Sequence, residues 1–243
     1  MRSTINVVLF GAILLAGCGE PSGTGSSEDT TRDLLASASQ EGTTGQDRVP
    51  AQEPTIDVAL LGYDHGQRSA PVRVVEMSDF GCSFCREFHL ETWPMILEKF
   101  VEPGKVEWKF LPFVNGMFKN SPSALRAAEC TLEQDAELFL TVTDRLWTDQ
   151  REWKGSADPD PLLRGWVEAA GADMERFDSC LGEDRRGERI AAANALTRQL
   201  GVRGTPTFFI IGYQPIQGAL PAEEFENILN LVYADATQGA PED

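Results

Sequence analysis

The chain has 243 residues and a formal net charge of −17, with 38 acidic side chains against 21 lysines and arginines. Nucleic acid phosphates attract basic surfaces, so this charge argues against a nucleic acid partner. Hydrophobic residues make up 42% of the chain, which is enough to bury a core, whereas five cysteines are too few for a disulfide scaffold. We therefore expect a globular protein whose cysteines are informative through their positions.

The N-terminus has the features of an export signal. Arg2 precedes an apolar stretch over residues 5–15, and small residues follow up to Cys18. The stretch is shorter than a permanent membrane helix, and small residues suit a signal peptidase. The four residues LAGC that end at Cys18 resemble a bacterial lipobox, in which the cysteine is acylated and becomes the mature N-terminus. We predict a lipoprotein signal peptide over 1–17 and a lipid on Cys18, which attaches the chain to a membrane. The alternative is an ordinary secretory signal or an uncleaved anchor with an incidental cysteine.

Residues 18–55 are rich in Gly, Ser, Thr, Asp and Glu and almost free of aromatic side chains. Such a segment buries too little apolar surface to offset the entropy of ordering its backbone. We predict a flexible acidic tether with an r.m.s. reach of roughly 30 to 35 Å. The expected location is extracytoplasmic, in a periplasm or at a cell surface.

The folded part is expected over 56–235, and it opens with a strand, a helix and a second strand. The β-branched run Val72–Met77 indicates a buried strand. A long helix follows Cys82, with a kink or restart at Pro94. Residues Val106–Phe113 then indicate a second strand, which completes a βαβ unit.

A change to helical patterns predicts a mainly helical insertion over about 116–200. The pairs Ser121-Pro122 and Asp160-Pro161 each look like an N-cap followed by proline at the first helical position.

Strand character returns over Val202–Ile211, and a further short strand is expected around Pro215–Gly218. Apolar residues at helical spacing up to Val232 predict a last helix. A C-terminal tail is expected over 236–243.

Cys82 and Cys85 form a Cys-x-x-Cys pair at the predicted junction between strand and helix. A thiol in the first turn of a helix faces unpaired N–H groups and the positive end of the helix dipole, which lower its pKa. We therefore predict that Cys82 is the nucleophile and that the more shielded Cys85 is the resolving thiol, which attacks a mixed disulfide at Cys82. A copper or zinc site of Cys82, Cys85 and His89 is one alternative, although the chain has only two histidines. A purely structural disulfide is the other.

Two separated motifs resemble the DsbA family of thioredoxin-fold proteins. The first is APV at 70–72 with EMSDFGCSFC at 76–85 and FH at 88–89, and the second is GVRGTPTF at 201–208. The resemblance spans about residues 57–234. It implies an α/β architecture, a thioredoxin fold with an inserted, mainly helical domain.

The resemblance also implies roles for residues around the cysteines. Pro206 is expected to be a cis-proline beside the active site, an ordinary trans proline being the alternative, and Thr205 to offer backbone hydrogen bonds to a substrate peptide. Ser83 and Phe84 are expected to contact substrate, at an apolar groove near Phe84 and Pro206. Because strongly oxidising members carry Pro-His where this chain has Ser83-Phe84, the direction of electron flow stays open.

Glu76 lies where the wider thioredoxin fold often places a buried acid below the disulfide. We expect it to accept the proton of Cys85 during exchange. A solvated carboxylate is the alternative, because strand alternation does not settle which way Glu76 points.

Cys130 and Cys180 both fall in the predicted insertion, and an exported compartment favours their pairing. We predict a structural disulfide between them. Two buried free thiols or a second redox relay are the alternatives.

These features predict an extracytoplasmic, membrane-tethered protein thiol–disulfide oxidoreductase. Its substrates would be cysteine-containing exported proteins, and a membrane redox partner would reset the active site. Neither a metal ion nor an organic cofactor is required. The alternatives are a reductase or isomerase for one client pathway, and a copper-binding assembly protein that uses Cys82, Cys85 and His89.

Overall fold

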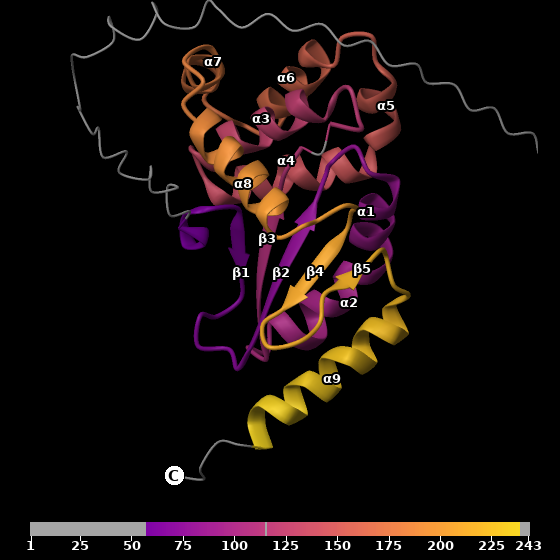
Figure 1. Cartoon of the computed structure of the whole chain (residues 1–243). Helices are drawn as coiled ribbons and strands as arrows, with labels where there is room; N and C mark the ends of the chain where they lie inside the picture. Colours follow the sequence, from indigo (N-terminus) through magenta and orange to yellow (C-terminus); the bar gives the residue numbers. More distant parts are fainter. Residues whose placement is uncertain (1–56, 115, 239–243) are drawn as a thin grey trace, which may run out of the picture. The chain divides into compact units, whose positions relative to one another are not determined.

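The computed structural model describes residues 57–114 and 116–238 (Figure 1). The predicted signal peptide, Cys18 and the predicted tether lie outside the described residues. None of the helices between residues 57 and 238 has the length and apolar character needed to cross a bilayer.

The described strands form one mixed sheet in the order β1-β3-β2-β4-β5. Its centre is the parallel pair β2 (Val72–Ser78) and β3 (Val106–Pro112), which the sequence predicts to within one residue. The antiparallel strands β4 (Thr207–Ile210) and β5 (Ile216–Gln217) extend it on one side, and β1 (Tyr63–His65) on the other.

Two strand predictions need correction. The predicted strand Val202–Ile211 narrows to β4, because Val202 packs against α8 and the backbone turns through a cis peptide bond before Thr207. The sequence did not predict β1, which is too short to show a period-2 pattern.

The helix after Cys82 is regular only in short pieces. It runs through α1 (Ser83–Glu87), a π-helical turn η2 (Phe88–Thr92), α2 (Trp93–Ile96) and a second π-helical turn η3 (Leu97–Val101). The predicted restart at Pro94 is confirmed, since α2 begins one residue earlier and has proline in its first turn.

Helices cover both faces of the sheet. Apolar side chains of the α1–η3 segment and of α9 (Ala222–Gln238) pack on the face to which Val72, Val74 and Trp108 point. Helix α8 (Gly187–Gln199) packs on the opposite face, against Met77 and Leu111. Helix α9 continues past 235, so the expected tail begins too early.

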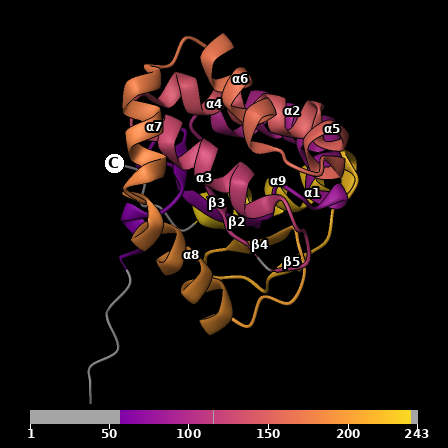
Figure 2. The same ribbon diagram turned by 90° about the horizontal axis from the view of Figure 1, so that it is seen from above.

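The chain between β3 and β4 is helical, as predicted. Its helices are α3 (Ser121–Leu132), α4 (Ala136–Thr148), α5 (Gln150–Gly155), α6 (Asp160–Ala169), α7 (Met174–Gly182) and α8. Figures 1 and 2 show α3 to α7 gathered over one end of the sheet, with α8 leading back along it.

The predicted caps of two of these helices are displaced by one residue. Asn120 and Pro159 occupy the N-cap positions, so Ser121 and Asp160 are the first helical residues and each proline is the second. Asp160 nevertheless places a carboxylate in the first turn, where the helix dipole favours it.

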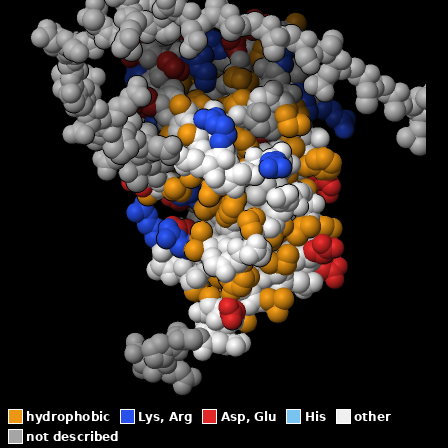
Figure 3. Space-filling view, viewed as in Figure 1, with side chains coloured by type: hydrophobic (Ala, Val, Ile, Leu, Met, Phe, Trp, Pro, Cys, Tyr) orange, Lys and Arg blue, Asp and Glu red, His pale blue; other side chains and the backbone are white. Residues whose placement is uncertain are grey.

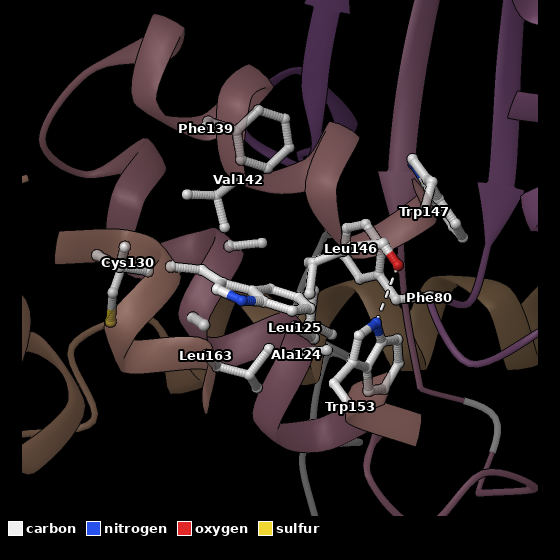
Figure 4. Close-up of a cluster of buried hydrophobic side chains, with 14 of the residues drawn as sticks. Phe80, Ala124, Leu125, Cys130, Phe139, Val142, Leu146, Trp147, Trp153 and Leu163 are labelled. Atoms are coloured by element: carbon white, nitrogen blue, oxygen red, sulfur yellow. Dashed lines mark hydrogen bonds between the residues drawn. The ribbon is translucent and has the colours of Figure 1, made fainter. Parts of the chain in front are cut away.

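The insertion has its own apolar core, which reaches the active-site cysteines. Phe80, from the loop before Cys82, packs with Trp147, and the indole N–H of Trp153 donates to the Leu146 carbonyl at 2.9 Å (Figure 4). The insertion and the thioredoxin fold therefore share one wall of the site.

The predicted Cys130–Cys180 disulfide is present and joins α3 to α7. It closes a loop with a sequence separation of 50 residues, for which the chain-entropy model gives about 4 kcal/mol of stabilisation.

Candidate active site

The Cys82–Cys85 pair lies where β2 leads into α1. Cys82 occupies the N-cap of α1 and Cys85 lies within the helix. Both are free thiols; Cys82 is 5% exposed and Cys85 is fully buried. This order of exposure agrees with the predicted nucleophile and resolving thiol.

The pKa of Cys82 is lowered to about 6. The largest cause of this lowering is a hydrogen bond from the Cys85 thiol, whereas burial acts in the opposite direction and raises the pKa. Hydrogen bonds from the side chain of Thr205 and from the backbone of Phe84 and Cys85 lower the Cys82 pKa further. The sequence argument anticipated the backbone N–H groups at the helix start but not the contribution of Cys85.

Burial raises the pKa of Cys85 well above its ordinary value, and the hydrogen bond to Cys82 and the Cys82 charge raise it further. Hydrogen bonds with the Ser78 side chain and the Asp79 backbone act in the opposite direction. One thiol is therefore poised as a thiolate near neutral pH, while its neighbour stays protonated.

The loop before β4 forms the other wall of the site. The Thr205–Pro206 peptide bond is cis, as the resemblance implies. The thiol of Cys82 lies 3.3 Å from the Thr205 carbonyl oxygen, to which it donates a hydrogen bond across 123 positions of sequence. The two motifs that carry the resemblance therefore meet at one sulfur atom.

Glu76 lies beneath the cysteines and is fully buried. Its Oε1 accepts a hydrogen bond from the Ser78 hydroxyl at 2.5 Å and lies 2.9 Å from His89 Nε2, and its Oε2 accepts the Trp108 indole N–H at 3.0 Å. Burial raises its pKa, but the charge of His89 and these three hydrogen bonds outweigh burial, so the pKa is lowered. The solvated alternative for Glu76 is wrong.

The structure places Glu76 near Cys85 through one intermediate, since the Ser78 side chain bonds to both. No role for Ser78 was predicted from the sequence. The role of Glu76 as proton acceptor for Cys85 stays a prediction.

His89 does not complete a metal site. Its Nε2 is held by Glu76, and its ring stacks on Trp147 with centroids 4.5 Å apart. Among the described residues, no three His, Cys, Asp or Glu side chains come together as metal ligands. The copper or zinc alternative of Cys82, Cys85 and His89 is therefore wrong in its ligand set.

Two polar side chains hold the loop before Cys82. Asp79 Oδ1 accepts the Gly81 amide at 2.9 Å and the Ser121 hydroxyl. The buried Gln150 of α5 donates to the carbonyl oxygens of Phe80 at 2.7 Å and Cys82 at 2.8 Å. Neither role was predicted, because an isolated Gln in a helical pattern gives no signal of a contact 68 positions away.

Ser83 and Phe84 are exposed beside Cys82, and the Phe84 side chain is 61% exposed. Ser83 borders an opening of about 450 Å³ lined by Arg151 and Lys154. A second hollow of about 290 Å³ lies along the α1–η2 segment, lined by Glu87, Glu91, Phe88 and Leu220 among others. On the face shown in Figure 3, hydrophobic and uncharged side chains occupy the middle, with few charges among them.

Three features of the site define the class of protein. They are a low-pKa thiolate at a helix start, a buried second thiol, and an adjacent cis-proline on a thioredoxin-type sheet. The protein is a thiol–disulfide oxidoreductase.

Comparisons with known proteins agree with this class. The family model described as thioredoxin matches residues 62–230. The disulfide bond formation protein D of Bacillus subtilis is 27% identical over 174 residues, which is 68% of this chain and 73% of that protein. A Na(+)/H(+) antiporter NhaA 3 of Salinispora tropica is 35% identical over 169 residues, but the match covers only 24% of that protein.

The crystal structure of Wolbachia pipientis α-DsbA1 has the same fold, with a TM-score of 0.64 and 21% identity over 73% of this chain and 96% of that one. The chain belongs to the thioredoxin family, and its fold is that of the DsbA structure.

Proposed function

We propose that this protein is a lipid-anchored, extracytoplasmic oxidase that introduces disulfides into exported proteins. The observation that carries the direction is the lowered pKa of Cys82 beside a protonated Cys85. A stabilised thiolate favours the reduced form of the pair over the disulfide, which makes the disulfide a stronger oxidant. The relative named for disulfide bond formation supports the same direction.

In the proposed reaction a substrate thiolate attacks Cys82 Sγ of the oxidised pair. The Cys82–Cys85 bond breaks, a mixed disulfide forms at Cys82, and Cys85 leaves with the electron pair and takes up a proton. A second substrate thiolate then attacks the substrate sulfur of the mixed disulfide and releases Cys82 as a thiolate. The substrate leaves with a disulfide, and the enzyme pair is reduced.

Substrate recognition is proposed at the surface around the two motifs. The exposed Phe84 ring offers apolar contact, and the backbone at Thr205 faces the mixed disulfide from the other side. Extended, unfolded chains suit this surface because main-chain pairing places few demands on side chains. A membrane redox partner would reoxidise Cys82 and Cys85 after each cycle.

The reduction potential of the Cys82–Cys85 pair tests the direction. We expect a value less negative than about −180 mV, the range of proteins that donate disulfides. It is measured by equilibration with glutathione buffers, with a Cys130→Ala/Cys180→Ala variant to show that the second pair does not contribute. A value near about −270 mV, as in thioredoxin, would instead support the reductase alternative.

The proposed anchor rests on the lipobox-like residues before Cys18, and the Cys130–Cys180 disulfide is consistent with an oxidising compartment. Mass spectrometry of the membrane fraction should find acylated Cys18 at the mature N-terminus. A Cys18→Ala variant should leave that fraction. An unmodified Cys18 in membrane-bound wild type contradicts the proposal.

A further inference from the structure

A buried polar chain leads away from the resolving thiol and is made of Ser78, Glu76 and His89. We propose that His89 is the group that exchanges the Cys85 proton with solvent, through Glu76 and Ser78. The proposal rests on the thiol–disulfide exchange at Cys82 and Cys85, but it holds for either direction of electron flow.

The hydrogen-bond directions in this chain favour proton transfer. The single hydroxyl hydrogen of Ser78 is donated to Glu76 Oε1. The Ser78 side chain also forms a hydrogen bond with Cys85 that lowers the Cys85 pKa, so Ser78 donates to that sulfur when it is a thiolate. The Ser78 hydroxyl therefore links the Cys85 sulfur to the Glu76 carboxylate, and its hydrogen can be donated to either of them.

The next link is His89. An ionised carboxylate only accepts hydrogen bonds, so the 2.9 Å contact with Glu76 Oε1 places a hydrogen on His89 Nε2. Cys85, Ser78 and Glu76 are fully buried, whereas the His89 side chain is 11% exposed. His89 is therefore the point at which this chain reaches solvent.

The position of His89 in the helix is also unusual. It lies in the π-helical turn η2, and its ring is fixed by stacking on Trp147 and by edge contacts with Phe110. π-Helical turns are rare and occur frequently at functional sites. The stacking holds Nε2 toward Glu76.

The groups around His89 leave Glu76 as its one directly bonded charged partner among the described residues. The elements packed against η2 present mainly aromatic rings to it. The titratable groups that interact with it are Glu76 from β2, to which it bonds, and His65 from β1, whose pKa it lowers. Arg86 from α1 donates to the carbonyl oxygens of Trp147 and Thr148.

The step that breaks the Cys82–Cys85 bond uses His89 in its charged form. When a substrate thiolate attacks Cys82, the Cys82–Cys85 bond breaks and Cys85 receives its electron pair. The proton moves from imidazolium Nε2 to Glu76, from Glu76 to Ser78 and from Ser78 to the Cys85 sulfur. Neutral imidazole remains, and solvent protonates it again.

The reverse reaction uses neutral His89 in the tautomer with its hydrogen on Nδ1, so that Nε2 can accept a proton from Glu76. When Cys85 attacks a mixed disulfide at Cys82, its proton moves through Ser78 and Glu76 to His89. The Cys82–Cys85 bond forms, and the substrate leaves as a thiolate. The charge of His89 therefore favours one step when present and the other when absent. Histidine is the side chain whose charge ordinarily changes between pH 5 and 8.

The chain supplies a matched control, because its only other histidine, His65, lies near the same carboxylate. Burial lowers the pKa of His65 to about 4, so it stays neutral above about pH 5. No hydrogen bond to Glu76 is present for it among the described contacts. His89→Gln keeps a side-chain donor to Glu76 but cannot titrate, and His65→Gln is its control.

The experiment measures both steps by quenched flow between pH 5 and 8.5, with a peptide of one cysteine as substrate. For wild type, the rate of Cys85 release per substrate thiolate should fall as pH rises, and the rate of Cys85 attack should rise. His89→Gln should remove both pH dependences and slow Cys85 release about 100-fold at pH 5.5, the lower end of general acid–base effects. His65→Gln should behave as wild type.

Unchanged pH profiles in His89→Gln would overturn the proposal, while retained exchange through Cys82 would leave the oxidoreductase class intact. Ser78→Ala gives a second test, because it removes the bridge and leaves His89 paired with Glu76. It should lose the same pH dependences. If Ser78→Ala keeps them, the proton does not travel this way.

Histidine NMR provides a readout that does not depend on turnover. In His65→Gln, one imidazole remains, and its titration midpoint should differ between the oxidised and reduced protein because Cys85 gains a proton on reduction. Ser78→Ala should reduce that difference. Identical midpoints in the two redox states of His65→Gln contradict coupling between Cys85 and His89.

Discussion

The two cysteine pairs of the described chain are both buried but differ in bonding and in the groups around their sulfur atoms. Cys82 and Cys85 are free and have pKa values displaced in opposite directions. Cys130 and Cys180 are bonded and buried in the core of the insertion. The reactivity of the first pair follows from the hydrogen bonds that stabilise the Cys82 thiolate. The sulfur atoms of Cys130 and Cys180 are instead bonded to each other.

The largest effect is expected from Cys82→Ser. Removal of the nucleophile should abolish disulfide transfer to a reduced substrate protein, because the variant cannot form the Cys82–Cys85 disulfide and Cys85 is fully buried. Cys85→Ser should instead accumulate mixed disulfides, visible by non-reducing electrophoresis. Full transfer activity in Cys82→Ser would falsify the assigned roles.

Removal of the other pair should affect stability and not exchange. The variant Cys130→Ala/Cys180→Ala should lose about 4 kcal/mol of unfolding free energy in urea, because the unfolded chain regains the entropy of a 50-residue loop. Alkylation of Cys82 under native conditions should match that of wild type. A large loss of Cys82 reactivity would show that the two pairs are coupled.

Gln150→Ala should have an intermediate effect. It removes the bonds to the Phe80 and Cys82 carbonyl oxygens and leaves that of Phe80 without its buried side-chain donor, which should cost about 2 kcal/mol and slow transfer by loosening the loop before Cys82. The matched control is Gln134→Ala, which removes two hydrogen bonds to the Asp173 backbone at an exposed position. Equal losses in the two variants would argue against a role for Gln150 in the active site.

The last contrast concerns pH. The Cys82 thiolate stabilises the reduced protein fully above about pH 9, and this stabilisation is lost as pH falls through about 6, since the folded pKa lies below the unfolded one. The difference in unfolding free energy between reduced wild type and Cys82→Ala should follow that window. The rate of Cys82 alkylation by iodoacetamide should have its pH midpoint near 6. Cys85→Ala should raise this midpoint, because the hydrogen bond from Cys85 is the largest cause of the lowered Cys82 pKa. An unmoved midpoint contradicts that cause.

Much of the fold could be predicted because its determinants are local. The run at β2, the Cys-x-x-Cys pair at the start of α1 and the proline before β4 each carry a short-range signal. The structure confirms the order of elements and the helical insertion. It corrects the predicted N-caps of α3 and α6 and the predicted start of β4. At each of these places the conformation of a few backbone residues sets where the element begins.

The remainder of the site could not be predicted because it depends on contacts distant in sequence. His89 was noticed, but as a metal ligand, since a one-dimensional pattern cannot show that its ring faces a carboxylate on a neighbouring strand. Gln150 and Ser78 were missed for the same reason. Their residue types are common, and only their place in the fold makes them important.

The order of the cysteines along the chain has a consequence for how the protein is made. If the chain enters an oxidising compartment N-terminus first, Cys82 is followed by its own partner, and Cys130 next meets Cys180. Each native pair is formed between neighbours in order of emergence, so correct pairing needs no later reshuffling. The thiol of Cys82, however, lacks the Thr205 carbonyl until the last part of the chain has arrived. The nascent protein thus holds its reactive sulfur before it has the carbonyl group that contacts that sulfur in the folded chain.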